Sequence, residues 1–361
     1  MRIVLDARKY YDYGIGTYIQ NLVAQLESQV ELVLIVAPSD AGRIQELSHV
    51  QQKINASRKY SFSELRSIAA DANELHADIF HAPHYTVPFG LKMPCVTTIH
   101  DILHVRGTSY YSPLHRLYAR AMIRHACHAS RAIIVDSEFT KQELLEVFPL
   151  VGDRVHVIHL GISPRYFKKY SEDEINGFKK YHGIVKPVIL YTGGLKPHKN
   201  LGVLISAFSQ MKHHADYQLV FSGESITRHR SLWTFIRQQG IANNVVDTGR
   251  ISSHELALAY QAASVVVLPS LYEGFGFSVL EAMASGTPAI GARAASIPEV
   301  MSDAGMLFDP HSPEELRIAL EQVLEDTALR QKLVQRGLNH AATYSWKACT
   351  DQTLAIYKDV Q

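Results

Sequence analysis

The sequence predicts an α/β protein made of two doubly wound parallel-sheet domains, and two observations lead to this fold class. Short apolar runs alternate with helical segments along nearly the whole chain, a pattern typical of βαβ units in a parallel sheet. The chain is 361 residues long, whereas a single hydrophobic core usually stops growing at about 250 to 300 residues. We therefore expect two separate cores.

The first half of the chain opens with one βαβ unit and continues with further strands. Strands are expected at residues 2–6, 31–36, 79–80, 95–99 and 132–135, and the first helix at residues 17–27. The loop at residues 7–17 contains Gly14-Ile15-Gly16 but lacks the third glycine of the dinucleotide fingerprint, so a nicotinamide site is not expected. Two interpretations of this segment remain: a plain flexible loop and a loop that approaches a phosphate.

The second half begins with a strand at residues 187–191, which leads through Gly193-Gly194 and Lys199 to a helix that opens at Leu201. Free N–H groups at a helix N-terminus attract a phosphate, and a lysine ammonium neutralises diphosphate oxygens. The spacing of these residues is not that of a Walker loop. Further strands are expected at residues 218–221 and 245–249.

Residues 265–290 are the most informative stretch, because their pattern predicts a strand, a glycine turn, a helix and a second strand. Glu273 lies just before the glycines of the turn, and Glu281 lies inside the helix. Carboxylates repel an anion at the helix N-terminus but accept hydrogen bonds well from vicinal hydroxyl groups. The simplest ligand with hydroxyl groups on both sides of a diphosphate is a nucleotide-sugar.

Composition excludes several classes of partner. The formal net charge of +1 gives no global bias toward nucleic acid. The three cysteines are far apart and lack metal-ligand spacing, which is typical of a reducing cytoplasm. The N-terminus has too short an apolar core for a signal peptide, and no run approaches the roughly 18 apolar residues of a membrane span. We expect a cytoplasmic protein without a nucleic-acid partner.

Histidines at strand ends are candidates for chemistry in the first half. His100 follows the apolar run 95–99, so it is placed at the carboxyl end of a strand, where open α/β sheets bind their ligands. A lone histidine is more often structural, and both interpretations remain open here. His81 and His84 follow an earlier strand and are weaker candidates for the same place.

Residues 102–131 form a basic segment with five arginines, four histidines and no acidic residue. Arg116, Arg120 and Arg124 recur at four-residue spacing, so a helix here would carry one basic stripe. Such a stripe is usually a solvated face, but with tyrosine and leucine beside it a helix can also dock on anionic lipid or an anionic acceptor. The second interpretation would place the protein at the inner face of the plasma membrane.

Taken in order, these motifs resemble those of family 4 retaining glycosyltransferases. The matching residues run over nearly the entire chain: Gly14-Ile15-Gly16, His100-Asp101, Gly193-Gly194 through Lys199-Asn200, Ser222-Gly223, Gly249-Arg250 and Glu273 through Glu281. The resemblance implies a GT-B fold, in which two Rossmann-like domains face a central cleft. It implies an acceptor-side domain at residues 1–165, a linker at 166–185, a nucleotide-sugar-binding domain at 186–340, and a helix at 341–361 that crosses back to the first domain.

The resemblance also implies roles for single residues. His100 would touch the sugar near the reacting carbon, Glu273 would contact the transferred sugar, and Lys199 would neutralise the diphosphate. The other expected donor-binding positions are Gly14, Gly16, Gly194, Arg250, Phe275, Gly276, Phe277, Ser278 and Glu281, with Glu281 on the ribose. Family members often carry an arginine six residues before the lysine, where this chain has Gly193. Either Lys196, His198 or Arg250 supplies that charge, or the diphosphate is held less tightly.

The expected reaction is front-face transfer of a sugar with retention, through an oxocarbenium-like transition state, to a saccharide or lipid-linked acceptor. Residues 195–200 resemble bacterial mannosyltransferases of polysaccharide assembly, which favours GDP-mannose over a UDP-sugar as donor. Because no Asp-x-Asp motif occurs, neither a metal ion nor another cofactor is expected. A nucleotide-sugar epimerase of the same fold and a non-catalytic glycan- or partner-binding module remain alternatives.

Overall fold

The computed structural model describes residues 1–41, 50–58, 61–107 and 110–361, and the chain forms two compact units. The first unit contains residues 1–161 and 345–361, and the second contains residues 162–344. The stretch 166–185, expected as a linker, holds helix α6 (Glu172–Tyr181), which packs on α9 within the second unit. The C-terminal stretch from Ser345 onward belongs to the first unit.

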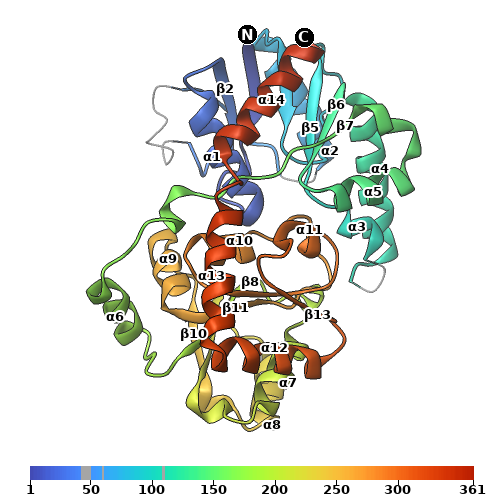
Figure 1. The fold of residues 1–361 in the computed structure, drawn as a ribbon. Helices are drawn as coiled ribbons and strands as arrows, with labels where there is room; N and C mark the ends of the chain where they lie inside the picture. Colours follow the sequence, from blue (N-terminus) through green and yellow to red (C-terminus); the bar gives the residue numbers. More distant parts are fainter. Residues whose placement is uncertain (42–49, 59–60, 108–109) are drawn as a thin grey trace. The chain divides into compact units, whose positions relative to one another are not determined.

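A seven-stranded parallel sheet, in the order β3-β2-β1-β4-β5-β6-β7, forms the centre of the first unit (Figure 1). Its strands are β1 (Arg2–Asp6), β2 (Glu31–Val36), β3 (Gln51–Ile54), β4 (Ile79–Ala82), β5 (Cys95–Ile99), β6 (Ala132–Val135) and β7 (Val155–Val157). Every residue of β4, β5 and β6 is buried. A parallel sheet covered by helices on both faces requires such continuous apolar strands, which explains the runs in the sequence.

The helices of the first unit are α1 (Tyr13–Leu26), α2 (Phe62–Glu74), α3 (Leu103–Arg106), α4 (Pro113–Ala129), α5 (Glu138–Val147) and α14 (Trp346–Val360). Helix α14 packs against α1, and the two chain ends lie on the same side of this unit (Figure 1). The Tyr357 hydroxyl contacts Nδ1 of buried His81 at 2.5 Å, so the last helix is tied to the central strand β4.

The first helix begins four residues earlier than the sequence pattern indicates. Because α1 starts at Tyr13, Gly14 and Gly16 lie in its first turn rather than in a loop. A Cβ on Gly16 would lie 2.5 Å from the carbonyl oxygen of Tyr10, whereas a Cβ on Gly14 would meet nothing within 4 Å. Gly16 therefore allows the preceding loop to pack closely on the helix.

A six-stranded parallel sheet, in the order β10-β9-β8-β11-β12-β13, forms the second unit. The strands are β8 (Val188–Gly193), β9 (Gln218–Gly223), β10 (Val245–Gly249), β11 (Ala263–Leu268), β12 (Ala289–Ala292) and β13 (Met306–Phe308). The helices are α6, α7 (Leu201–Gln210), α8 (Arg230–Gln238), α9 (Ser253–Ala262), α10 (Phe277–Ala284), α11 (Ile297–Met301), α12 (Pro313–Glu325) and α13 (Thr327–Ala341). Residues 265–290 form β11, α10 and β12, the βαβ unit that their pattern predicts.

Capping residues set several helix starts in both units. Ser61, Ser171 and Ser252 each accept a hydrogen bond from the backbone N–H three residues on, where a glutamate bonds back to the serine N–H. These reciprocal bonds satisfy N–H groups that have no partner inside the helix.

Strand order locates the crevice in each sheet where a ligand can bind. The order reverses between β1 and β4 in the first sheet and between β8 and β11 in the second. In open α/β sheets, ligands bind outside the carboxyl ends of the strands at this reversal, because the neighbouring loops diverge to opposite faces. The segments that follow β8 and β11, residues 194–200 and 269–276, therefore flank the candidate site of the second unit.

Candidate functional site

Lys199 and Glu273 meet at the strand-order reversal of the second sheet. The Lys199 ammonium donates to Oε1 of Glu273 at 2.7 Å, and the Ser270 hydroxyl donates to the same oxygen at 2.6 Å. The two charged side chains are 21% and 15% exposed, so both are mostly shielded yet accessible to a ligand. The structure thus brings together two of the three residues predicted to be catalytic.

Asn200 joins the two loops that carry this pair. Its backbone adopts the left-handed conformation with φ of 56°, which asparagine tolerates better than most residues. Its side-chain amide donates to the carbonyl oxygens of Pro269 at 3.1 Å and of Pro310 at 2.8 Å. The backbone of Leu271 also donates to the His198 carbonyl at 2.8 Å. These contacts fix the distance between the lysine and glutamate loops, and sequence patterns gave no sign of them.

The N-terminus of α10 lies directly after the glutamate loop. Gly276 precedes the helix with φ of 103°, a conformation that favours glycine, and no side chain caps the helix. Phe277 and Ser278 form the first helical turn, while Phe275 is buried. The Ser296 hydroxyl bonds the carbonyls of Glu273 and Phe275 at 2.9 and 3.0 Å and shapes this turn. The uncapped N–H groups form a seat for an anion.

Glu281 lies in α10 and is held by tyrosine hydroxyls. Tyr260 donates to its carboxylate at 2.7 Å, and Tyr166 forms a second hydrogen bond to it. Burial raises the pKa of Glu281, and the hydrogen bonds from Tyr260 and Tyr166 oppose that rise. Tyr260 also contacts the Thr192 hydroxyl at 3.0 Å. The carboxylate is therefore fixed in orientation, and neither tyrosine was recognised from the sequence because both are distant along the chain.

The glycines after β8 permit close backbone packing. Gly193 and Gly223 have φ of 140° and 120°, and a Cβ on Gly223 would lie 2.5 Å from the Gly193 carbonyl oxygen. The Tyr191 hydroxyl donates to the Gly194 carbonyl at 2.5 Å, and the Glu224 carboxylate accepts from the Leu195 backbone at 3.0 Å. Gly194 thus lies in the lysine loop as predicted.

Arg250 is not placed beside the Lys199 and Glu273 pair by any described contact. It is exposed and follows the edge strand β10, which β9 separates from β8. The carboxylate of Asp247, near the end of β10, accepts hydrogen bonds from Ser225, Thr227 and Gly249. Burial opposes ionisation of Asp247, but these bonds outweigh it and lower its pKa. The replacement for the family arginine at Gly193 is therefore not evident among these contacts.

In the first unit, His100 pairs with a carboxylate on the neighbouring strand end. His100 follows β5 and Asp136 follows β6, and Nδ1 of the ring lies 2.6 Å from Oδ2 of Asp136. Burial disfavours the charged ring, but the Asp136 carboxylate outweighs burial and raises the pKa of His100. Tyr18 of α1 packs edge-on against the same ring at 5.0 Å.

The weaker histidine candidates have different environments. His81 is fully buried and contacts both Tyr357 and the Thr98 hydroxyl, so it is a structural residue. Burial lowers its pKa to about 3. His84 stacks on Tyr85 with ring centres 3.9 Å apart, and burial followed by the charge of Lys9 lowers its pKa.

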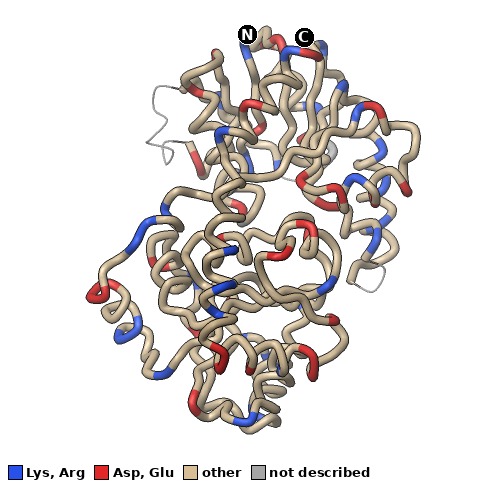
Figure 2. The backbone as a smooth tube through the Cα atoms, viewed as in Figure 1, with Lys and Arg blue, Asp and Glu red and all other residues tan. Residues whose placement is uncertain are grey.

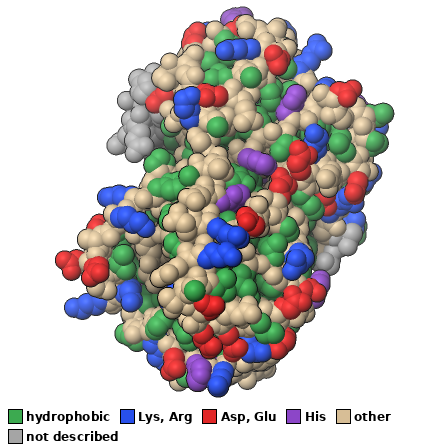
Figure 3. All heavy atoms as spheres, in the orientation of Figure 1, with side chains coloured by type: hydrophobic (Ala, Val, Ile, Leu, Met, Phe, Trp, Pro, Cys, Tyr) green, Lys and Arg blue, Asp and Glu red, His purple; other side chains and the backbone are tan. Residues whose placement is uncertain are grey.

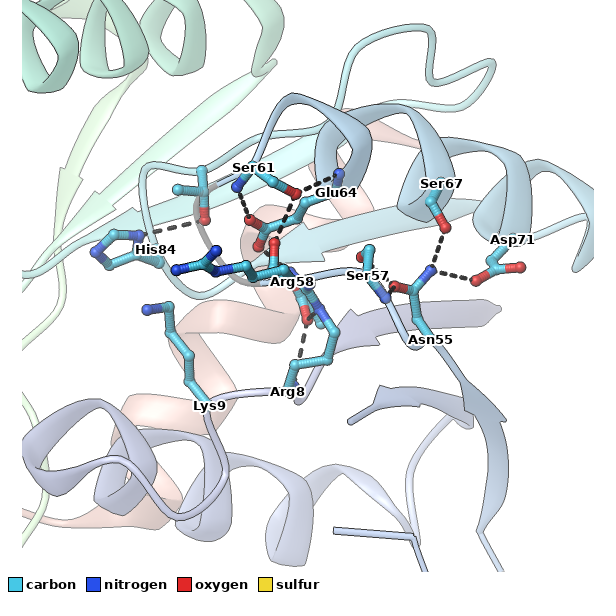
Figure 4. Close-up of polar contacts among 12 residues, drawn as sticks. Arg8, Lys9, Asn55, Ser57, Arg58, Ser61, Glu64, Ser67, Asp71 and His84 are labelled. Carbon is cyan, nitrogen blue, oxygen red and sulfur yellow. Dashed lines mark hydrogen bonds and ion pairs between the residues drawn. The ribbon is translucent and has the colours of Figure 1, made fainter. Parts of the chain in front are cut away.

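A buried ionic network lies beside His84 at the carboxyl end of β1 (Figure 4). The Arg8 guanidinium bonds the carboxylates of Asp6 at 2.8 Å and Glu64 at 2.6 Å, and its side chain is only 3% exposed. One guanidinium bridges two carboxylates here, so the network fixes the start of α2 against β1. The side chains of Lys9 and His84 lie next to it in the same view (Figure 4).

The two parallel-sheet units place the chain in the GT-B fold class. HepE of Anabaena, solved in complex with UDP and glucose, matches with a TM-score of 0.83 at 19% identity, over 99% of this chain and 100% of that one. WaaG, a glycosyltransferase involved in lipopolysaccharide biosynthesis, matches with a TM-score of 0.78 at 15% identity, over 99% of each chain.

The sequence places the chain within that class. The model for group 1 glycosyl transferases matches residues 175–340, and the model for Glycosyltransferase Family 4 matches residues 13–166. The chain belongs to glycosyltransferase family 4 and is a glycosyltransferase. It is 28% identical to O-antigen chain mannosyltransferase B of Escherichia coli over 97% of both chains. It is 30% identical to an uncharacterized glycosyltransferase of Methanocaldococcus jannaschii, over 74% of this chain and 70% of that one.

Proposed function

We propose that this glycosyltransferase moves a sugar, with retention, from a nucleotide diphosphate to a saccharide or lipid-linked saccharide acceptor. The observation that carries the proposal is the pairing of Lys199 with Glu273 beside the uncapped N-terminus of α10. A cation and the N–H groups of a helix N-terminus suit the diphosphate, and the carboxylate suits hydroxyl groups of the transferred sugar. All of these groups lie in the crevice at which open α/β sheets bind ligands.

The chemistry of this arrangement is electrostatic. As the glycosidic bond breaks, negative charge grows on the leaving diphosphate, and the Lys199 ammonium and α10 amides stabilise it. We assign Glu273 to the transferred sugar, where its negative charge stabilises the oxocarbenium-like transition state. Glu281, oriented by Tyr260 and Tyr166, accepts the ribose hydroxyls.

GDP-mannose is the preferred donor, since the relative matched over nearly its full length acts as a mannosyltransferase. The UDP-bound HepE makes a UDP-sugar the alternative. A thermal-shift panel of GDP, UDP and ADP with their sugars separates the two, because a ligand that binds only the folded protein raises its melting temperature. A larger shift with UDP than with GDP would reject the GDP-mannose assignment.

Mass spectrometry of the reaction products, with NMR for the anomeric configuration and the identity of the sugar, tests the transfer itself. Incubation with GDP-mannose alone should give at most slow hydrolysis, and addition of a mannose-terminated oligosaccharide should give a product one hexose heavier with the α configuration retained. Conversion of the donor sugar without an acceptor would indicate an epimerase instead. The reaction should proceed at the same rate in excess EDTA, because Lys199 and the α10 amides serve the diphosphate; a rate restored only by Mg²⁺ or Mn²⁺ would contradict metal independence.

The outer face of α4 is the surface we assign to an anionic membrane. Leu114 and Leu117 are 77% and 66% exposed, and Arg120 and Arg124 are exposed one and two turns further along the helix. Basic positions recur along the α4 segment of the backbone (Figure 2). Exposed leucines can enter the lipid while arginines contact anionic headgroups. On the visible face of the second unit, by contrast, basic and acidic side chains are interspersed (Figure 3).

Fewer arginines contribute to the basic surface than the sequence indicated for residues 102–131. Residues 108 and 109 of this segment lie outside the described residues. Arg106 pairs with Glu143 at 3.1 Å and with Glu146, so its charge is balanced by α5 and it does not extend the stripe. None of the helices within the described ranges is long and apolar enough to cross a bilayer.

Vesicle flotation tests this surface. Wild-type protein should float with vesicles containing about 30% phosphatidylglycerol. It should dissociate in about 0.5 M salt, because salt at that ionic strength screens surface charge over a Debye length of about 4 Å. Leu114→Ser with Leu117→Ser should abolish flotation, and Leu150→Ser, at another exposed leucine of the first unit, should not. Equal flotation with neutral phosphatidylcholine vesicles would contradict the assignment.

A further inference from the structure

The His100 and Asp136 pair has features that a structural contact does not need. Asp136 is almost fully buried, with a side chain 2% exposed, and His100 is 14% exposed. Among the described residues, Nε2 of His100 and Oδ1 of Asp136 are buried without a hydrogen-bond partner. Leaving a buried polar atom unsatisfied is energetically costly, and such atoms are concentrated at functional sites.

The segment after β6 fixes His100 at two points. The Asp136 carboxylate contacts its ring, and the Thr140 hydroxyl donates to its backbone carbonyl at 3.3 Å. Thr140 is itself held by Ser137, the residue that caps α5. Because the ring and the backbone are both restrained from the neighbouring strand end, the orientation of the free ring edge is set before a ligand arrives.

We propose that Asp136 is a positioning residue that accepts the Nδ1–H of His100 and stabilises the doubly protonated ring, which presents Nε2–H as a hydrogen-bond donor to a substrate hydroxyl. The proposal rests on the proposed function for its substrate, but the orientation of the ring does not depend on it. A carboxylate on Nδ1 allows only ring states with a proton on that atom, since the other neutral tautomer would place two lone pairs face to face.

Some of the other charged and titratable groups near the ring favour protonation of His100, and others oppose it. Asp101 on the same loop favours the charged ring, as does the Pro83 carbonyl. His81 on β4 and His84 after β4 are held neutral by burial, and each interacts unfavourably with a charged His100. Asp136 is the charge in direct contact with the ring, so its removal should change the protonation of His100 more than any other single substitution.

NMR of the histidine rings in the ligand-free protein tests the positioning without any substrate. In the wild type, the ¹⁵N shifts of His100, assigned with His100→Gln, should show a protonated Nδ1 above and below its pKa. Asp136→Asn keeps an acceptor but removes the charge, so the pKa of His100 should fall. Asp101→Asn is the matched control: it removes a nearby carboxylate that does not touch the ring, and should lower that pKa less and leave Nδ1 protonated.

Kinetics test the link to the reaction. The kcat/KM should decline at alkaline pH as His100 deprotonates, and Asp136→Asn should move that decline to lower pH by the amount seen in the NMR titration. Asp136→Ala should lower kcat/KM by about 10- to 100-fold, and Asp136→Asn should recover part of this below the new pKa.

Three results would overturn the proposal: a neutral His100 protonated on Nε2, an Asp136→Asn titration no different from Asp101→Asn, or a pH profile that Asp136→Asn leaves unmoved. Thermal unfolding of each variant identifies one that fails to fold, and the more conservative Asp136→Asn then decides. Inactivity of the wild type toward every nucleotide-sugar would refute the proposed function, while the ring tautomer would still report on the positioning.

Discussion

Replacement of Lys199 with methionine tests the donor site most directly, because the structure separates its effect on stability from its effect on activity. The substitution removes one charge-assisted hydrogen bond, but Glu273 keeps its 2.6 Å bond from Ser270 and is partly exposed. We therefore expect a loss of only about 1 to 2 kcal/mol of unfolding free energy. For a unit of this size that corresponds to a melting temperature lowered by about 2 to 8 °C.

The effect on transfer should be much larger. Loss of one preorganised donor to a developing negative charge typically lowers kcat by about 100- to 1,000-fold, or about 2.7 to 4 kcal/mol. Initial rates with GDP-mannose and an oligosaccharide acceptor, together with calorimetric titration of GDP, measure both the rate and the binding of the diphosphate. The variant Glu273→Gln, made alone and in combination with Lys199→Met, completes a double-mutant cycle. Because the two residues are in contact, their effects on the rate should not be additive.

Lys196→Met provides the matched control, since it removes an equal charge from an exposed position in the same loop. We expect its activity to stay within about threefold of the wild type, as is typical of surface charges. If Lys199→Met retained activity within a few-fold of the wild type, or if Lys196→Met were equally damaging, the assignment of the diphosphate site to Lys199 would be wrong.

Three further results are expected from contacts described above. Tyr260→Phe removes a hydrogen bond that lowers the pKa of Glu281. The affinity for GDP should therefore fall by about 5- to 10-fold, and the loss should be larger at pH 6 than at pH 8. Calorimetry that shows no change would argue against a ribose contact at Glu281. Gly16→Ala places a Cβ 2.5 Å from a backbone oxygen and should destabilise the protein by about 1 to 3 kcal/mol, whereas Gly14→Ala, with nothing within 4 Å, should not; equal urea midpoints would show that the loop can move. His81 is neutral when folded, with a pKa of about 3, whereas its pKa in the unfolded chain is about 6.5. The stability that His81 contributes should be fully present above pH 6.5 and fall as the pH decreases toward 3, by up to about 1.4 kcal/mol per pH unit. Urea unfolding at pH 6 and pH 5 measures this slope, which should become shallower in His81→Gln.

The sequence predicted the fold and the positions of most strands because both depend on local patterns. Continuous apolar runs are required by a parallel sheet buried on both faces, and the glycine turn before α10 has a recognisable spacing. The boundary of α1 was placed too late, because glycines normally weaken a helix and Gly16 is used here for close packing. Arg106 was counted in the basic segment 102–131, since its acidic partners lie on another helix.

The candidate site was only partly predictable, because several of its contacts join residues that are far apart in the sequence. Motif spacing singled out Lys199, Glu273 and Glu281, and the structure shows the first two in direct contact. The groups that orient them, among them Asn200 and Tyr260, act across 69 and 21 residues of sequence respectively. Contacts of that kind depend on which loops the strand order brings together, and no local pattern records them.

The return of the chain to the first unit has a consequence for biosynthesis. The seven-stranded sheet is complete by residue 157, but the helix that covers α1 and bonds His81 is made only after the whole of the second unit. During translation an apolar face of the first unit's helix α1 therefore stays uncovered until residues 162–344, which form the second unit, have been made. Such a nascent intermediate is prone to aggregation. Variants that slow folding of the second unit should consequently lower the yield of a first unit whose own residues are unchanged.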